Sequence, residues 1–210
     1  MTTPTTVWCI RHGETDWNAE GRWQGHAPVP LNETGLAQAA ALKHYLAAKN
    51  VRFDALYSSP ASRAMQTAQA VAEAAQLEIQ PEARLREVDL GEWQGLTRSE
   101  ACAWDGKRFA EFEADRYNVP PPGGETRLQL MIRAREAFDA ITARHSGAYV
   151  ALVTHGGTLG MLIESLLGKI KRPTLSNTSI TILVGNGDEW QLERIAWAPH
   201  LETPAIGETW

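Results

Sequence analysis

The chain has 210 residues, of which 43% are hydrophobic and 21% are charged, as in an ordinary globular protein. Its 20 lysines and arginines face 25 aspartates and glutamates, and the net charge of −5 argues against nucleic acid or an anionic membrane as the main partner. No apolar run approaches the roughly 20 residues of a membrane span, and residues 1–6 lack the parts of a signal peptide. We therefore expect one domain over residues 1–210, in the cytoplasm.

Strand-like and helix-like segments alternate from the N-terminus. The apolar run 7–10 predicts a buried strand, and a polar loop covers residues 15–32. Residues 55–57 and 77–80 predict two further short strands. A helix is predicted between the 15–32 loop and the strand at 55–57, with Leu36, Ala39, Leu42 and Leu46 facing inward. A second helix begins near Ser62, and its inward residues are Ala64, Ala68, Val71, Ala72 and Ala75.

The middle of the chain is less regular. The Thr97-x-x-Glu100 spacing predicts a capped helix that reaches about Phe112, and the proline- and glycine-rich stretch 119–124 predicts irregular structure. A helix opening at Glu125-Thr126, a strand at 150–153 and a further helix follow. The inward residues of these two helices are predicted to be Leu128, Met131, Ala134, Phe138 and Ile141, and then Leu159, Leu162, Ile163 and Leu166.

Two last strands, 179–184 and 190–195, predict a hairpin around Gly185-Asn186-Gly187-Asp188. Alternating strands and helices predict an α/β fold with three α/β/α layers around a mostly parallel sheet. The closing hairpin would add an antiparallel edge to that sheet.

Two of the predicted strands end in the same kind of turn. Residues 7–10 lead into Arg11-His12-Gly13, and residues 150–153 lead into Thr154-His155-Gly156. The Ser62-Arg63 pair follows a third strand. Open α/β sheets bind ligands at the carboxyl ends of their strands, so we expect these groups to share one site.

The chemistry of these residues suits a phosphate monoester. A neighbouring arginine keeps a histidine neutral and therefore nucleophilic, and arginines also grip phosphate oxygens. Helix N-termini at the same edge would add backbone N–H donors. The leaving oxygen needs an acid, for which Glu87 is the first candidate, with Asp89 and Glu92 close by in the sequence.

Other kinds of site find little support. The six histidines show no zinc-type spacing, and Cys9 and Cys102 form no disulfide framework. The sequence has neither a nucleotide-binding glycine loop nor a Gly-x-Ser-x-Gly motif. We therefore expect chemistry from side chains alone, with no metal and no cofactor.

These motifs resemble, in order, those of the histidine phosphatase superfamily, the family of phosphoglycerate mutases and related phosphatases. The resemblance covers nearly the whole chain and implies a phosphoglycerate mutase-like fold. It rests on Arg11-His12-Gly13-Glu14-Thr15, Ser58-Ser59-Pro60 with Arg63 and Thr67, Leu85-Arg86-Glu87 and Thr154-His155-Gly156-Gly157, and extends to Asn18, residues 22–25, 90–95 and 122–126, and His200.

The resemblance also implies roles. His12 would carry the phosphoryl group, and Arg11, Arg63 and His155 would hold it. Glu87 would act as the acid and later as the base that activates water. The phosphate pocket would include Asn18, Gln24, Gly25 and Gly156. Glu14 fits a structural hydrogen-bonding role at least as well as a catalytic one, and three tryptophans near the motifs could wall the pocket or simply anchor loops: Trp17, Trp23 and Trp93.

Three functions are compatible with these roles. We expect a phosphomonoesterase acting on a small-molecule phosphate ester, with cofactor-dependent mutase chemistry as the alternative. The compact middle and the run 88–93, which lacks the Arg-His-Tyr-Gly pattern of the mutases, favour hydrolysis. A non-catalytic phosphate-binding protein is disfavoured because every reactive group is present. Val29 lies where the family often has an acidic residue, so the contacts of that loop with the substrate stay open. The identity of the substrate and the oligomeric state, whether monomer or homodimer, also stay open.

Overall fold

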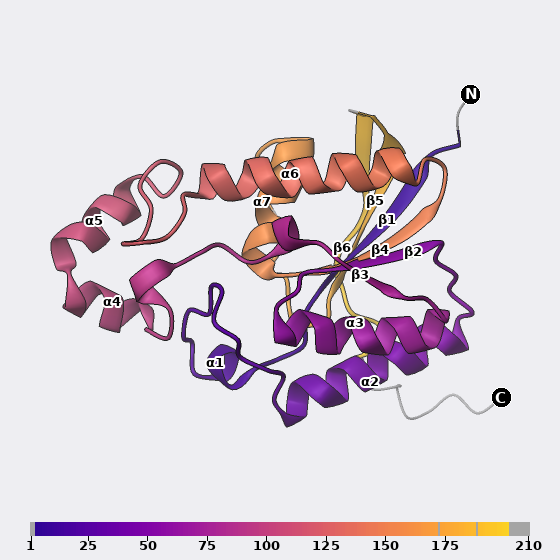
Figure 1. Ribbon diagram of the computed structural model, residues 1–210, viewed down its shortest axis with the longest axis horizontal. Coiled ribbons are helices and arrows are strands. Elements are labelled where there is room, and N and C mark those ends of the chain that lie inside the picture. Colours follow the sequence, from indigo (N-terminus) through magenta and orange to yellow (C-terminus); the bar gives the residue numbers. More distant parts are fainter. Residues whose placement is uncertain (1–2, 172, 188, 202–210) are drawn as a thin grey trace.

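A six-stranded sheet forms the centre of the computed structural model, which describes residues 3–171, 173–187 and 189–201 (Figure 1). The strand order is β3-β2-β4-β1-β5-β6. Parallel pairing joins β3 to β2, β2 to β4 and β4 to β1, whereas β5 pairs with β1 and with β6 in the antiparallel sense. The strands are β1 (Thr5–Arg11), β2 (Ala55–Ser58), β3 (Ile79–Pro81), β4 (Tyr149–Thr154), β5 (Ile180–Asn186) and β6 (Glu189–Trp197). The predicted mostly parallel sheet with an antiparallel edge is confirmed.

Helices cover both faces of this sheet. Figure 1 shows α2 (Glu33–Ala48) and α3 (Ser62–Ala75) on one side and α6 (Arg127–Arg144) and α7 (Gly156–Leu167) on the other. Successive residues of a strand point to opposite faces. Accordingly, Val150 and Leu152 pack with α6 and α7, while Ala151 and Val153 pack with α2 and α3. The three predicted layers are thus present, and the alternation explains why both faces of β4 are apolar.

The segment between β3 and α6 extends beyond the sheet. It contains η1 (Ala83–Leu85), η2 (Gly91–Trp93), α4 (Arg98–Trp104) and α5 (Gly106–Ala114), and Figure 1 shows α4 and α5 projecting to the left of the layers. A separate apolar cluster holds it together, made of Trp93, Ala101, Phe109 and Phe112. The predicted single helix from Thr97 to about Phe112 is wrong. Asp105 ends α4 and its side chain caps α5 by accepting from the backbone N–H of Arg108 at 3.0 Å.

Five predicted inward residues lie further out than expected, among them Ala75 and Leu166, which are only partly buried. Leu36 is 50% exposed and Leu128 is 39% exposed, while Met131 is only partly buried. Two of these helices start their buried stripe elsewhere, α2 at Gly35 and α6 at Leu130. Gly35 takes that place because α2 packs closely on the first loop, where a Cβ at Gly35 would lie 2.0 Å from the Glu14 carbonyl oxygen.

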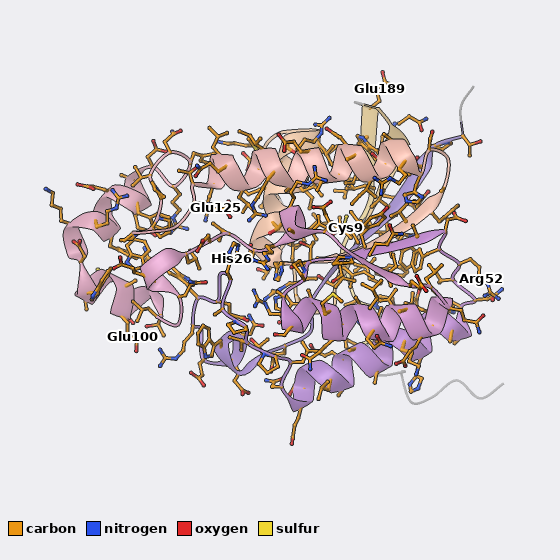
Figure 2. The ribbon with its side chains drawn as sticks, in the orientation of Figure 1. Cys9, His26, Arg52, Glu100, Glu125 and Glu189 are labelled. Atoms are coloured by element: carbon orange, nitrogen blue, oxygen red, sulfur yellow. The ribbon has the colours of Figure 1, made fainter. Side chains whose placement is uncertain are left out.

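Smaller features complete the fold. The polar loop at 15–32 contains a four-residue helix, α1 (Asp16–Ala19), and the third strand lies slightly later than predicted. Cys9 lies in the sheet layer (Figure 2), where burial raises the pKa of its thiol to about 12. Among the described residues, no helix is both long and apolar enough to span a membrane.

Candidate active site

The carboxyl ends of β1, β4 and β2 bring the candidate residues together. β1 and β4 are paired so that Arg11 lies opposite Thr154, which places His12 and His155 side by side as the next residues. The backbone N–H of His12 donates to the Thr154 carbonyl at 2.9 Å, and the two imidazole rings lie 5.1 Å apart between centroids. Sequence-distant histidines therefore share one site, as the two turns predicted.

A cavity of about 350 Å³ opens at this edge of the sheet. Every residue predicted for the site lines it except His155, which is fully buried behind the wall. These lining residues are Arg11, His12, Asn18, Gln24, Gly25, Arg63, Glu87 and Gly156.

The imidazole of His12 is held in one tautomer. Its Nδ1 lies 2.7 Å from the Gly13 carbonyl oxygen, and a carbonyl can only accept, so Nδ1 carries the proton and Nε2 keeps its lone pair. Burial, followed by the positive charges of Arg63 and Arg11, lowers the pKa of His12 well below 6.5. Thr67 fixes the same turn by accepting from the Gly13 N–H at 3.0 Å. A neutral ring with a free Nε2 is a nucleophile at neutral pH.

His155 supplies a different group. Its Nε2 lies 2.8 Å from the Ser59 hydroxyl oxygen, and its Nδ1 has no partner among the described residues. Burial, and then the charges of Arg63, His12 and Arg11, lower the pKa of His155 well below 6.5. In the free protein this ring is therefore neutral, so the second, cationic contact that the resemblance implied is not a positive charge here.

The positive charge comes from two arginines, Arg63 and the partly buried Arg11. Arg63 is fully buried and donates through Nη1 to the Ala27 carbonyl at 3.0 Å and through Nη2 to the Gly25 carbonyl at 2.8 Å. Burial lowers the pKa of Arg63 to about 10 and also lowers that of Arg11. A guanidinium keeps its charge in proteins. The Nε atoms of both side chains are buried without a partner in the described part of the chain. Unpaired buried donors are uncommon, and here they leave N–H groups available to an anion.

The carboxylate of Glu87 faces this cluster. Its Oε2 accepts from the Gly157 N–H at 2.9 Å, and its Oε1 accepts from the Thr158 N–H at 3.0 Å. The carboxylate thus sits at the N-terminus of α7, where the helix dipole favours negative charge. Asp89 is used elsewhere, since it accepts from the Gly91 N–H at 2.9 Å, and the side chain of Glu92 is exposed. Of the three carboxyl groups that the sequence offered, Glu87 is the one that lines the cavity.

Comparison with known proteins decides the family. The family model described as the histidine phosphatase superfamily (branch 1) matches residues 7–198. The chain belongs to this superfamily. It is 36% identical over 197 residues to phosphoglycerate mutase-like protein 4 of Arabidopsis thaliana, covering 92% of this chain and 85% of that protein. It is 33% identical over 201 residues to the metal-independent phosphoserine phosphatase of the same plant, covering 95% and 84%. The solved structure of Bacillus stearothermophilus YhfR superposes with a TM-score of 0.86 at 34% identity, covering 94% of this chain and all of that one.

The remaining predicted residues of this histidine phosphatase superfamily member have mixed roles. Asn18 lines the cavity and also caps α1, its Oδ1 accepting from the Thr15 N–H at 3.2 Å. Gln24 is buried with its Oε1 unpartnered among the described residues, and the Gly25 carbonyl holds Arg63. Glu14 does not line the cavity. Its carboxylate accepts from the Asn32 side chain at 3.1 Å, which favours the structural reading of Glu14.

The three tryptophans separate in the same way. Trp23 lines the cavity, whereas Trp93 is fully buried in the cluster that supports Trp23, with ring centroids 5.8 Å apart. Trp17 packs beside Gly95 instead, where its ring would be 3.2 Å from a Cβ at that glycine. The Val29 loop is fixed by Ser62, whose hydroxyl donates to the Val29 carbonyl at 3.0 Å.

The sequence analysis gave no site role to several residues that line or support the cavity. The outer wall includes Arg22, Leu90, Phe112, Arg116 and Arg127. Arg116 follows a run of acidic residues that is most simply interpreted as a solvated surface, so no pattern marked it. Arg133 was missed for a different reason, because its contacts are to backbone carbonyls, which no sequence motif records. Ser59, the partner of His155, could have been found, since it belongs to the Ser58-Ser59-Pro60 motif.

Proposed function

We propose that this protein is a metal-independent phosphomonoesterase that hydrolyses small phosphate esters through a phosphohistidine on His12. The observation that carries the proposal is the state of His12: a buried, neutral ring whose Nδ1 proton is committed to the Gly13 carbonyl. Arg11 and Arg63, with buried donors that lack protein partners in the described residues, surround the place where a phosphate would accept that attack.

In the first half-reaction, the Nε2 lone pair attacks phosphorus and a P–N bond forms while the P–O bond to the leaving group breaks. Glu87 gives a proton to the leaving oxygen, which departs as an alcohol. The imidazole becomes a cation, and its Nδ1–H keeps the hydrogen bond to Gly13. Arg11, Arg63 and the N–H groups at the start of α7 stabilise the charge on the equatorial oxygens.

In the second half-reaction, the Glu87 carboxylate takes a proton from water as the water oxygen attacks phosphorus. The P–N bond breaks, its electron pair returns to Nε2, and inorganic phosphate leaves. Glu87 then carries the proton for the next turnover, so protons and charge balance over the cycle. Its fixed position at the start of α7 supports use in both steps, because the same oxygen must serve the leaving alcohol and the incoming water.

Mutase chemistry is the second candidate, because one of the similar proteins is named phosphoglycerate mutase-like. It shares the first half-reaction, after which the phosphoryl group returns to a bound sugar acid. The relative named as a metal-independent phosphoserine phosphatase supports hydrolysis without metal. Among the described residues, no cluster of three or more His, Cys, Asp or Glu side chains could hold a metal ion.

The test is an assay in chelator on a panel of phosphate esters that includes 3-phosphoglycerate, with and without a bisphosphoglycerate primer. We expect phosphate release from one or more esters, and isomerisation that is slower than release. Primer-dependent isomerisation faster than phosphate release would instead favour the mutase. His12→Ala should abolish both turnover and labelling of the protein by phosphate, whereas His44→Ala, an exposed histidine on α2, should retain them.

A further inference from the structure

The segment that carries Glu87 is irregular. Residues 86–90 lie between η1 and η2 and pair with no strand of the sheet. General acid catalysis needs a carboxyl group that is held within a fraction of an ångström of its place. Something other than sheet pairing must therefore hold this part of the chain.

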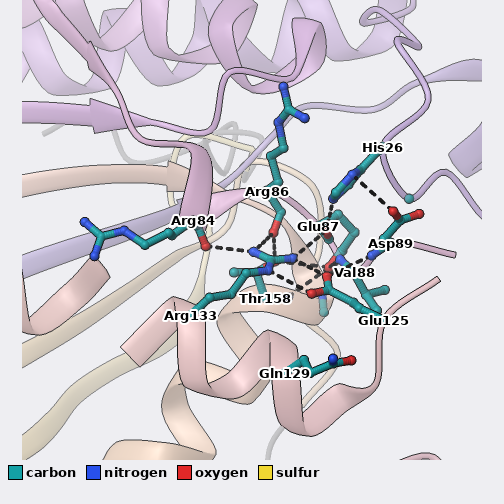
Figure 3. A network of polar contacts seen from close by, with 12 residues as sticks. His26, Arg84, Arg86, Glu87, Val88, Asp89, Glu125, Gln129, Arg133 and Thr158 are labelled. Atoms are coloured by element: carbon teal, nitrogen blue, oxygen red, sulfur yellow. Dashed lines mark hydrogen bonds and ion pairs between the residues drawn. The ribbon is translucent and has the colours of Figure 1, made fainter. Parts of the chain in front are cut away.

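One guanidinium, that of Arg133 on α6, binds three carbonyls of this region. Its Nη1 donates to the Arg84 carbonyl at 2.7 Å and to the Arg86 carbonyl at 2.7 Å, and its Nη2 donates to the Glu87 carbonyl at 2.8 Å (Figure 3). The chain thus wraps around Arg133 at the point where the Glu87 side chain departs.

Glu125 holds the other side of the same guanidinium. Its Oε2 accepts from Nε of Arg133 at 3.0 Å, and its Oε1 accepts from Nη2 and also from the Asp89 N–H at 2.9 Å. All five N–H donors of Arg133 are therefore used, two by Glu125 and three by backbone carbonyls. A lysine has three donors and no planar fork, so it cannot replace this set.

Two further side chains complete the support. His26 contributes Nε2, 2.9 Å from the Glu87 carbonyl oxygen, and the Thr158 hydroxyl donates to the Arg86 carbonyl at 2.8 Å. Figure 3 shows these groups converging on residues 84–89 from separate elements, and Figure 2 places His26 and Glu125 between the projecting α5 and the sheet layers. Arg133 does not line the cavity, so it can act on the reaction only through the residues that it holds.

We infer that Arg133 is a positioning residue for proton transfer, fixing the backbone that aims Glu87 at the leaving oxygen. This inference rests on the proposed function, because it assumes that Glu87 protonates the leaving group. It predicts an effect that depends on the ester. Poor leaving groups need the proton, whereas nitrophenolate leaves without it.

The experiment compares kcat/KM for glycerol phosphate and for nitrophenyl phosphate in Arg133→Lys. A shift of about 1 Å in a reacting group can cost about 10²-fold, and we expect a loss of that size with glycerol phosphate and a much smaller one with nitrophenyl phosphate. Arg135→Lys is the matched control. Arg135 lies on the same helix, is similarly exposed and pairs with Asp139 instead, so both esters should be hydrolysed as by the parent protein.

A double-mutant cycle with Glu87→Gln separates positioning from general structural support. If Arg133 acts through Glu87, adding Arg133→Lys to Glu87→Gln lowers the glycerol phosphate rate no further. Additive losses, or equal losses on both esters in Arg133→Lys, would overturn the inference while leaving the proposed function in place. Equal losses on both esters in Glu87→Gln itself would reject the acid assignment, and the inference with it.

Thermal unfolding of each variant shows whether the fold is intact. Should Arg133→Lys unfold at the assay temperature, Glu125→Gln provides a second comparison, because it disturbs the two bonds that orient the guanidinium. Glu125 also lines the cavity, so the ratio of the losses on the two esters is compared, not the size of either loss. The same ester-dependent loss would support the inference, and an even loss would contradict it.

Discussion

Gly157 is the position where a single methyl group would most directly disturb Glu87. A Cβ built at Gly157 would lie 2.5 Å from Oε1 of Glu87, 3.0 Å from its Cδ and 3.2 Å from Oε2. Carbon and oxygen atoms in contact lie about 3.3–3.6 Å apart, so the carboxylate would have to retreat by about 1 Å. The substitution adds no backbone strain at Gly157, because its φ lies outside the left-handed region and the residue is helical.

The consequences for stability and for rate should therefore diverge. Alanine is favoured over glycine in a helix by about 1 kcal/mol, which offsets part of the loss of a hydrogen bond to a charged group, about 1.5–3 kcal/mol. The net loss of about 0.5–2 kcal/mol should lower the melting temperature of Gly157→Ala by no more than about 8 °C. A displacement of about 1 Å in the proposed acid should lower kcat/KM for an alkyl phosphate by about 10²-fold.

The assay measures kcat/KM for glycerol phosphate and nitrophenyl phosphate beside a thermal melt. Gly106→Ala is the control, since Gly106 is exposed, helical and has nothing within 4 Å of its added Cβ. Full activity of Gly157→Ala on glycerol phosphate would refute the reasoning, because the carboxylate cannot keep its place beside that methyl group. A large fall in melting temperature with equal losses on both esters would show that the substitution acts through the fold instead.

Three further predictions concern charge, pH and backbone geometry. Arg63→Lys loses the hydrogen bonds to the Gly25 and Ala27 carbonyls, each worth about 1.5–3 kcal/mol, so kcat/KM should fall at least about tenfold. The control Arg52→Lys, at the far end of the sheet (Figure 2), should leave kcat/KM unchanged. Burial keeps the pKa of His12 and His155 well below 6.5 and lowers that of His200 to about 4. The unfolded chain then binds more protons, so the free energy of unfolding, measured with denaturant, should fall as the pH drops below 6.5, and less so in His200→Gln. Gly91→Ala should cost about 2 kcal/mol or more of folding free energy and lower the melting temperature by several degrees, because φ is +50° and a Cβ would lie 2.0 Å from the Pro122 carbonyl oxygen. Gly123→Ala is the control for backbone strain alone, since φ is +70° but the added Cβ meets no atom within 4 Å, and it should lower the melting temperature less.

The sequence predicted the layered fold because the signals that define it are local. β-branched runs closed by glycine marked β1 and β4, and alternation of strands with amphipathic helices implied parallel pairing. The errors fall where tertiary contacts override those signals. The capping-box spacing of Thr97 and Glu100 predicted where a helix begins, but it did not show that Asp105 would end that helix and cap the next. Leu36 looked like a core residue, but close packing of Gly35 on the first loop turns it outward.

The residues of the site likewise fall into those that the sequence could predict and those that it could not. Histidines and arginines that follow strands were placed correctly, because strand register alone brings His12 beside His155. The resemblance favoured Glu87 over Asp89, but the sequence does not show why: only the Glu87 carboxylate meets the start of α7. Arg133 could not be found from the sequence. Its partners are main-chain oxygens, and any residue type at positions 84 and 86 would present them.

The two halves of the proposed chemistry are thus supported in different ways. His12 is anchored by the sheet itself, through the Thr154 carbonyl and the turn at Gly13. Glu87 lies in the irregular segment 86–90, whose backbone carbonyls are bound by side chains from α6, α7 and the first loop. Substitutions that loosen this second support should spare attack on phosphorus while slowing proton transfer. Because hydrolysis needs Glu87 twice and attack by His12 needs only a neutral ring, the irregular segment is where changes in leaving-group preference should arise among variants of this fold.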